Sequence, residues 1–292
     1  MRIEDVSATS CIKFAPEHTM TSDDVARVYD EDAQNEWERL NIRRVEFGVT
    51  CRALDQYLPP PPARILDVGS GPGRYAIRLK QQGYSVAIVD VSRKCLQLAE
   101  EKAAQEGLSF DAVVCGAATN LAAFSDGQFD AVLLMGPLYH LKVESERTAA
   151  ITEAMRVMQA NGVLFSVHLS RYSVLRYAAK VRPAQLSAEP TFYNSILQNG
   201  VGELGNSFLD ACYCADPLEI QPFMESLGLT TVELIGCEGV VAEVEEKLNE
   251  LREEDFDRWV DLNYRLGRRK ELHAVSAHLL HVGQKGGGPA QG

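Results

Sequence analysis

Three glycines at alternate positions, Gly69, Gly71 and Gly73, follow a short apolar segment that contains Asp67. Glycine has no Cβ, so a turn built from these residues can be tight and lets a ligand approach the backbone closely. The next apolar segment ends about 20 residues further on at Asp90, where a carboxylate can accept hydrogen bonds from both hydroxyls of a ribose. The spacing therefore predicts a nucleotide-binding crevice.

Three alternatives apply to such a turn. The nicotinamide dinucleotide fingerprint requires Gly-x-Gly-x-x-Gly, but Arg74 stands where its last glycine belongs. The phosphate-binding P-loop ends in Gly-Lys-Ser or Gly-Lys-Thr, and no such triplet follows. A purely structural turn would explain the glycines, but it would not explain Asp67 and Asp90 together.

Candidate groups for proton transfer lie after two later apolar runs. Tyr139 and His140 follow the fourth predicted strand, and His168 ends the fifth. The carboxyl ends of parallel strands share one edge of a sheet, and a histidine there can act as a base while a tyrosine forms a wall or donates a hydrogen bond. A tyrosine and a histidine in a loop also often pack and cap, so this structural alternative stays open. Three further histidines on or beside the last predicted strand are treated as structural: His273, His278 and His281.

The elements that would position these groups alternate between short apolar runs and helical segments, the pattern of βαβ units. Strands are predicted at residues 64–68, 85–90, 110–115, 129–135, 162–168, 231–235 and 277–282. Helices are predicted at residues 75–82, 92–105, 144–158 and 217–227, with one long acidic amphipathic helix at 241–266. The expected fold is therefore α/β, with a doubly wound sheet.

The chain divides into three predicted parts. Residues 1–62 form a tail and a helical cap, which ends at the four prolines Pro59–Pro62 because successive prolines cannot continue a helix. Residues 63–285 form the binding domain, and residues 286–292 a glycine-rich flexible tail. Within the domain, residues 171–213 show no strong period and are predicted to be an inserted lid. Its aromatic residues could line an acceptor pocket: Tyr172, Tyr177, Phe192 and Tyr193.

Taken together, the motifs resemble the class I S-adenosylmethionine-dependent methyltransferases, in the small-molecule branch that includes ubiquinone and menaquinone biosynthesis enzymes. The most specific segments are LDVGSGPG at 66–73, VDVS at 89–92 and GQFDAVLLMGPLYHL at 127–141. The resemblance implies a seven-stranded Rossmann-like sheet whose last strand is antiparallel. It also implies S-adenosylmethionine as methyl donor, with a small-molecule acceptor methylated on oxygen, nitrogen or carbon by direct displacement.

Under this resemblance, the cofactor residues lie in the glycine turn and at the strand ends: Asp67, Gly69, Ser70, Gly71, Asp90, Val91, Ala118 and Met135. Tyr29 and Arg44 of the helical cap are candidates to touch the methionine end. The sequence departs from the family at Ala117, where an acid often binds the adenine amino group. Two alternatives remain: a catalytically silent cofactor-binding regulatory protein, and a protein or RNA methyltransferase. No Asn/Asp-Pro-Pro-Tyr/Phe motif follows the fourth strand.

Composition narrows the function classes. The formal net charge is −12, from 29 basic and 41 acidic residues, and such a surface repels nucleic acid. No run of about 18 apolar residues predicts a membrane span. The first residues are acidic and lack an apolar core of signal-peptide length, so the cytoplasm is expected. Oligomeric state is not predicted.

Seven scattered cysteines without Cys-x-x-Cys spacing indicate a reduced protein. Cys212 and Cys214 would share one face of a strand, which allows either a soft-metal thiol site or two packing cysteines. Packing is favoured because no second ligand pair is visible, so no metal site is predicted.

Overall fold

The computed structural model describes residues 22–204, 212–242 and 244–286. Most of the two predicted tails, residues 1–21 and 287–292, therefore lies outside the described residues, as do residues 205–211 of the predicted insertion. Among the helices that these ranges contain, none is both long enough and apolar enough to cross a membrane.

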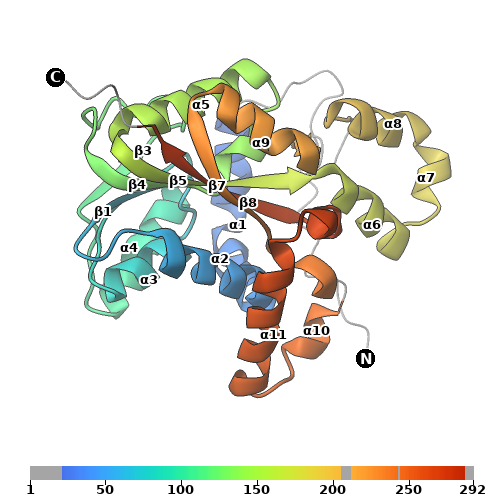
Figure 1. Ribbon diagram of the computed structural model, residues 1–292, viewed down its shortest axis with the longest axis horizontal. Helices are drawn as coiled ribbons and strands as arrows, with labels where there is room; N and C mark the ends of the chain where they lie inside the picture. The colour runs from blue at the N-terminus through green and yellow to red at the C-terminus, as the bar shows by residue number, and fades with distance from the viewer. Residues whose placement is uncertain (1–21, 205–211, 243, 287–292) are drawn as a thin grey trace.

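A twisted sheet in the order β3-β2-β1-β4-β5-β8-β7 forms the centre of the molecule (Figure 1). Its strands are β1 (Arg64–Val68), β2 (Ser85–Asp90), β3 (Ala112–Cys115), β4 (Phe129–Leu134), β5 (Met158–Ser170), β7 (Leu229–Gly236) and β8 (His278–Lys285). The first five are parallel, and β8 runs antiparallel to both β5 and β7. The two-residue β6 (Cys214–Ala215) pairs with the end of β5. This short strand apart, the predicted doubly wound, seven-stranded sheet with an antiparallel last strand is confirmed.

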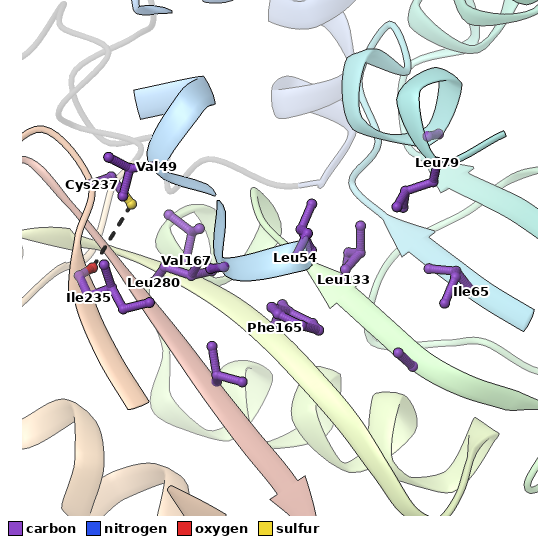
Figure 2. Close-up of a cluster of buried hydrophobic side chains, with 14 of the residues drawn as sticks. Val49, Leu54, Ile65, Leu79, Leu133, Phe165, Val167, Ile235, Cys237 and Leu280 are labelled. Atoms are coloured by element: carbon purple, nitrogen blue, oxygen red, sulfur yellow. Dashed lines mark hydrogen bonds between the residues drawn. The ribbon is translucent and has the colours of Figure 1, made fainter. Parts of the chain in front are cut away.

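Helices cover both faces of this sheet (Figure 1). The helices α5 (Glu144–Val157) and α9 (Pro217–Ser226) lie on one face; α2 (Arg44–Tyr57), α3 (Arg74–Gln81), α4 (Arg93–Gln105) and α11 (Glu253–Gly267) lie on the other. Successive strand residues point to opposite faces, so Phe165 joins the core under α2 and α11 while Leu164 joins the core under α5. Figure 2 shows the first of these cores, where Phe165 and Leu54 are fully buried. Burial on both faces explains why the strands are nearly continuous apolar runs.

The N-terminal cap contains two helices. The predicted helical stretch is divided at Arg43 into α1 (Ser22–Ile42) and α2. α1 packs against α4 rather than against the sheet. This packing brings one side of α1 to the carboxyl ends of the strands.

The insertion after β5 is helical, which the sequence pattern did not indicate. It contains α6 (Arg171–Val181), α7 (Gln185–Ala188) and α8 (Pro190–Asn199), which lie at one end of the molecule (Figure 1). Ser170 caps α6 by accepting a hydrogen bond from the Tyr172 N–H, and Gly200 ends α8 with φ 74°. These helices pack around a small core of their own that contains Val174, Phe192 and Ile196. Their shortness hides the period in the sequence.

The predicted helix at 241–266 is wrong in its extent. The structure has a 3₁₀ turn η3 (Gly239–Val241), a short α10 (Glu245–Leu248), then α11, and a 3₁₀ segment η4 (Lys270–Val275) before β8. Glu245 turns inward and accepts the Val45 N–H at 2.8 Å, and the Asn249 amide donates to the Ile42 carbonyl at 2.8 Å. These bonds to the cap hold α10 as a separate turn.

Candidate functional site

A crevice lies beyond the carboxyl ends of β1, β2 and β4, where the order of strands reverses along the sheet. Ligands of doubly wound folds bind at this point because the connecting loops diverge there. Residues predicted for the site meet in it from distant parts of the chain. Those that line the crevice are Tyr29, Asp67, Gly69, Ser70, Gly71, Asp90, Val91, Ala118, Met135, Tyr139 and His140. Ala117 also lines it, so the position of the missing acid faces the crevice.

The glycine turn links β1 to both neighbouring strands. The N–H groups of Gly69 and Ser70 both donate to the Val89 carbonyl, at 2.7 and 3.2 Å. Gly69 adopts φ 73°, and a Cβ there would lie 2.4 Å from Cδ of Pro137. Gly71 adopts φ 52°, but a Cβ there would meet nothing nearer than Cγ of Glu36 at 3.9 Å. Gly69 therefore lets two loops touch, whereas Gly71 leaves the backbone open to the crevice.

Asp90 organises the turn from the end of β2. Its two carboxylate oxygens accept the Gly71 N–H and the Ser92 N–H, each at 2.8 Å. Burial raises the pKa of Asp90 to about 6, although these two bonds favour the charged form. Burial, and then the nearby Asp90, raises the pKa of Asp67 to about 7. A carboxylate has about four acceptor positions, so Asp90 retains two for the hydroxyls of a ligand.

Helix α1 forms one wall of the crevice. Asp30 accepts hydrogen bonds from the Ser92 hydroxyl at 2.6 Å and from the Lys94 N–H at 3.1 Å. Ser92 is also the N-cap of α4, where its hydroxyl accepts the Cys95 N–H at 3.0 Å. The start of α4 is thereby joined to both Asp90 and α1. This contact directs one face of α1, which carries Tyr29, Glu36 and Arg39, toward the crevice.

Tyr29 of α1 meets His140 across the crevice. The Tyr29 hydroxyl lies 2.9 Å from His140 Nε2, and the two rings meet edge to face with centroids 5.5 Å apart. His140 belongs to the 3₁₀ turn η1 (Pro137–His140), which directly follows β4, and its ring lies 4.7 Å from that of Tyr139. Burial raises the pKa values of both tyrosines well above the ordinary value, so both keep their protons at neutral pH. Three titratable side chains thus lie together beyond the carboxyl end of β4: Tyr29, Tyr139 and His140.

Arg44 does not line the crevice, whereas Arg39 of the preceding helix does. Arg44 donates twice to the Glu253 carboxylate, at 2.7 Å each, and its guanidinium lies 4.0 Å from the centre of the Phe256 ring. It therefore joins α2 to α11. Arg39 lines the crevice and is held by Glu36 at 2.8 Å and Glu46 at 2.7 Å. Burial opposes its charge, but Glu46 and then Glu36 raise the pKa of Arg39 above its ordinary value.

His168 is also absent from the crevice. β5 continues to Ser170, so His168 is an interior strand residue, 4% exposed, with Nε2 3.2 Å from the Ser166 hydroxyl. Burial, followed by the nearby His281, lowers the pKa of His168 to about 3 and keeps it neutral. None of the aromatic residues predicted for the lid at 172, 177, 192 and 193 lines the crevice, although the Tyr213 N–H donates to the carbonyl of the lining residue Tyr139 at 2.7 Å. Tyr172 instead donates to Asp216 at 3.1 Å.

One charged group behind the crevice could not be found from the sequence. It consists of Glu46 of α2, Glu238 after β7 and His278 of β8. Each offers one atom of a type that can bind a metal, and these atoms lie within 4.8 Å of one another. The His278 Nδ1 hydrogen-bonds Glu238, and its ring lies 6.3 Å from that of Tyr139. His278, treated above as structural, therefore contacts the wall of the site. No local motif marks this group, because its members come from three elements.

Part of the chain matches a known domain family. Residues 65–162, from β1 into β5, match the family described as a methyltransferase domain. This range contains the glycine turn, Asp90, and the Tyr139–His140 segment, but not the cap or β8. The resemblance to class I S-adenosylmethionine-dependent methyltransferases, predicted from the motifs, is confirmed, as is S-adenosylmethionine as the cofactor of this class.

Individual relatives extend this match. The glycine/sarcosine N-methyltransferase of Parasynechococcus marenigrum is 28% identical over 176 residues, which are 58% of this chain and 60% of that protein. The ubiquinone biosynthesis O-methyltransferase of Xanthomonas axonopodis pv. citri is 32% identical over 146 residues, 50% of this chain and 57% of that protein. The match thus spans less than two thirds of the length of these relatives.

A solved structure shows the same fold. The crystal structure of a SAM-dependent methyltransferase from Methanosarcina mazei superposes with a TM-score of 0.55 and 19% identity, covering 81% of this chain and 98% of that one.

Proposed function

We propose that the protein transfers a methyl group from S-adenosylmethionine to a small-molecule acceptor by direct displacement. The observation that carries this proposal is the placement of two different groups in one crevice. The glycine turn and Asp90 form a nucleoside cradle on one side, and the paired Tyr29 and His140 lie at the end of β4 on the other.

The residues of the crevice fit the cofactor. Gly71 leaves its backbone uncovered, and Asp90 has acceptor positions left for two ribose hydroxyls. Arg39 has guanidinium N–H groups beyond those bonded to Glu36 and Glu46, and these can bind the carboxylate at the methionine end. Bound S-adenosylmethionine supplies a methyl group on a positively charged sulfur, which is activated for displacement without help from the protein.

The chain's own residues then have to align the acceptor, exclude water and take up a proton. Alignment alone can contribute much of the rate. His140 can accept a proton at Nε2 from an oxygen or nitrogen acceptor that replaces the Tyr29 hydroxyl there, and until then this hydroxyl orients the ring. Tyr139 and Leu141 form the adjoining wall, while α1 shields the site from solvent. The names of the relatives include both an N- and an O-methyltransferase, which supports a small acceptor for this chain as well.

The cofactor site can be tested by calorimetry with S-adenosylhomocysteine, the demethylated product. Asp90→Asn removes the charge and one acceptor oxygen. Two hydrogen bonds to a charged group are together worth about 3 kcal/mol, so binding should weaken about 100-fold. Asp111→Asn is the matched control, because Asp111 pairs with Ser85 and Lys80 at the opposite edge of the sheet. Equal affinities of wild type and Asp90→Asn would contradict the ribose assignment.

Catalysis can be tested by incubating the protein with methyl-labelled S-adenosylmethionine and a metabolite extract. The expected result is a labelled product that is heavier than its precursor by one methylene unit. His140→Asn should lower turnover by roughly 10²–10⁴-fold, with binding of S-adenosylhomocysteine nearly unchanged. Cofactor binding without turnover on any acceptor would instead favour a silent regulatory protein, and label in protein or RNA would favour a macromolecular acceptor.

A further inference from the structure

A chain of four charged side chains leads from the crevice into the protein. Arg39 of α1 donates to Glu46 Oε2 at 2.7 Å, and the same oxygen lies 3.7 Å from His278 Nδ1. His278 Nδ1 in turn hydrogen-bonds Glu238. The second carboxylate oxygen of Glu238 accepts the backbone N–H groups of Ala277 and His278, at 3.0 and 2.9 Å. Glu238 is thereby fixed on the backbone of β8, at the far end of the chain from the ligand.

Only the Arg39 end of this chain faces the crevice. Glu46 is 6% exposed and Glu238 is 4% exposed, so hydration by bulk water cannot stabilise the charge of either carboxylate. Buried charges are tolerated when each has a partner of opposite sign. Here Glu46 lies between two cationic groups, and His278 lies between two anionic ones. A change in the charge of any member must therefore alter the pairing of the others.

The groups that face His278 come from four elements. They are Glu238 after β7, Glu46 of α2, Arg39 of α1 and the ring of Tyr139 in η1. Burial lowers the pKa of His278, but Glu46 and Glu238 outweigh burial and Arg39, and raise it to about 8. His278 is thus charged at neutral pH and shares Glu46 with Arg39. If His278 were neutral, Arg39 would be the one cation paired with Glu46 among the described residues. Glu46 would then offset more of the guanidinium's charge, and Arg39 would attract an anionic ligand less strongly.

A divalent cation is a poor occupant of this group. The donors of Glu46, Glu238 and His278 are of suitable type, but they are already paired within the chain, and Arg39 supplies the positive charge beside Glu46. A cation would have to displace both Arg39 and the His278–Glu238 hydrogen bond.

We propose that His278, fixed by Glu238, is a positioning residue: it holds Glu46 so that Arg39 presents its guanidinium to the carboxylate end of the bound cofactor. This rests on the proposed function, in which Arg39 binds that carboxylate. The four charged side chains join β8, which lies between β5 and β7 in the sheet, to the cap helices α1 and α2. No member other than Arg39 needs to touch the ligand.

The test compares two ligands that differ in the carboxylate. S-adenosylhomocysteine carries the amino-acid end, whereas 5′-methylthioadenosine lacks it. His278→Asn should weaken binding of S-adenosylhomocysteine about tenfold and leave 5′-methylthioadenosine within about twofold. The matched control is His281→Asn, because His281 is a buried histidine of the same strand that bonds Thr231 and lines no part of the crevice. It should leave both affinities unchanged.

A second variant checks the coupling. Glu46→Gln should also weaken S-adenosylhomocysteine selectively, and adding His278→Asn to it should have little further effect, because both act through Arg39. A general structural loss would weaken both ligands alike, and that result, or no change in either, would overturn the proposal. If wild type bound neither ligand, the cofactor assignment itself would fail, so the two failures are distinguishable.

A measurement on the unmodified protein serves if either variant does not fold. The ¹⁵N signal of Arg39 Nε, assigned by its loss in Arg39→Lys, should shift with a midpoint near the pKa of His278, about 8. A signal that stays constant between about pH 6.5 and 9.5 would overturn the proposal.

Discussion

Replacing Gly69 with alanine should destabilise the fold more than replacing Gly71, although both residues adopt the left-handed backbone conformation. The left-handed conformation costs an alanine about 1–2 kcal/mol, partly offset because alanine also restricts the unfolded chain. This cost is common to the two variants. The difference between them comes from their neighbours.

At Gly69 the new methyl group would lie 2.4 Å from Cδ and 2.6 Å from Cγ of Pro137. A proline ring cannot rotate away, so the start of η1 has to shift, and such overpacking costs typically about 1–3 kcal/mol. Gly69→Ala should therefore lower the free energy of unfolding by about 2–4 kcal/mol. Gly71→Ala should lower it by about 1 kcal/mol, because the methyl group meets only Cγ of Glu36 at 3.9 Å.

Binding should show the opposite order. The methyl group of Gly71→Ala enters the crevice, so this variant should lose affinity for S-adenosylhomocysteine while remaining the more stable of the two. Urea unfolding at one pH measures stability without ligand, and calorimetry measures binding. Equal losses of stability, or unaltered binding by Gly71→Ala, would refute the assignment of Gly69 to loop contact and Gly71 to ligand contact.

Two further predictions concern charged residues. The pKa of His278 is raised to about 8 from an ordinary 6.5, so its contribution to stability is complete below pH 6.5 and is lost as the pH rises through 8. The shift corresponds to about 2 kcal/mol. Urea unfolding at several pH values should show this loss in wild type but not in His278→Asn, and parallel curves would contradict it. Arg44→Ala should leave binding of S-adenosylhomocysteine within about twofold, since Arg44 packs on Phe256 outside the crevice. A clearly larger loss by calorimetry would instead support contact of Arg44 with the methionine end of the cofactor.

The sequence predicts well which residues around the glycine turn line the crevice, because the information is local. A buried strand, a glycine turn and the start of a helix lie within a few residues of each other, and Asp90 ends the neighbouring strand. The geometry of such a unit follows from strand pairing alone. Gly69, Gly71 and Asp90 consequently all line the crevice, as expected.

The cap could not be predicted to the same level, because the break at Arg43 resets the helical phase. In one continuous helix each residue turns by about 100° around the axis, so the direction of the Arg44 side chain would follow from that of Arg39. The structure separates them into α1 and α2, and of the two only Arg39 lines the crevice. For His168 the error was one of length: β5 extends two residues beyond it, so that it lies within the strand rather than at its edge.

The contact between Gly69 and Pro137 also indicates where acceptor preference could be redesigned. Because the nucleoside cradle and the start of η1 are in van der Waals contact, changes up to Pro137 would disturb cofactor binding together with acceptor choice. Tyr139 and Leu141 lie beyond that contact and still line the crevice. Tyr139 also faces His278, so a library at Leu141 would explore new acceptors with the smaller effect on cofactor affinity.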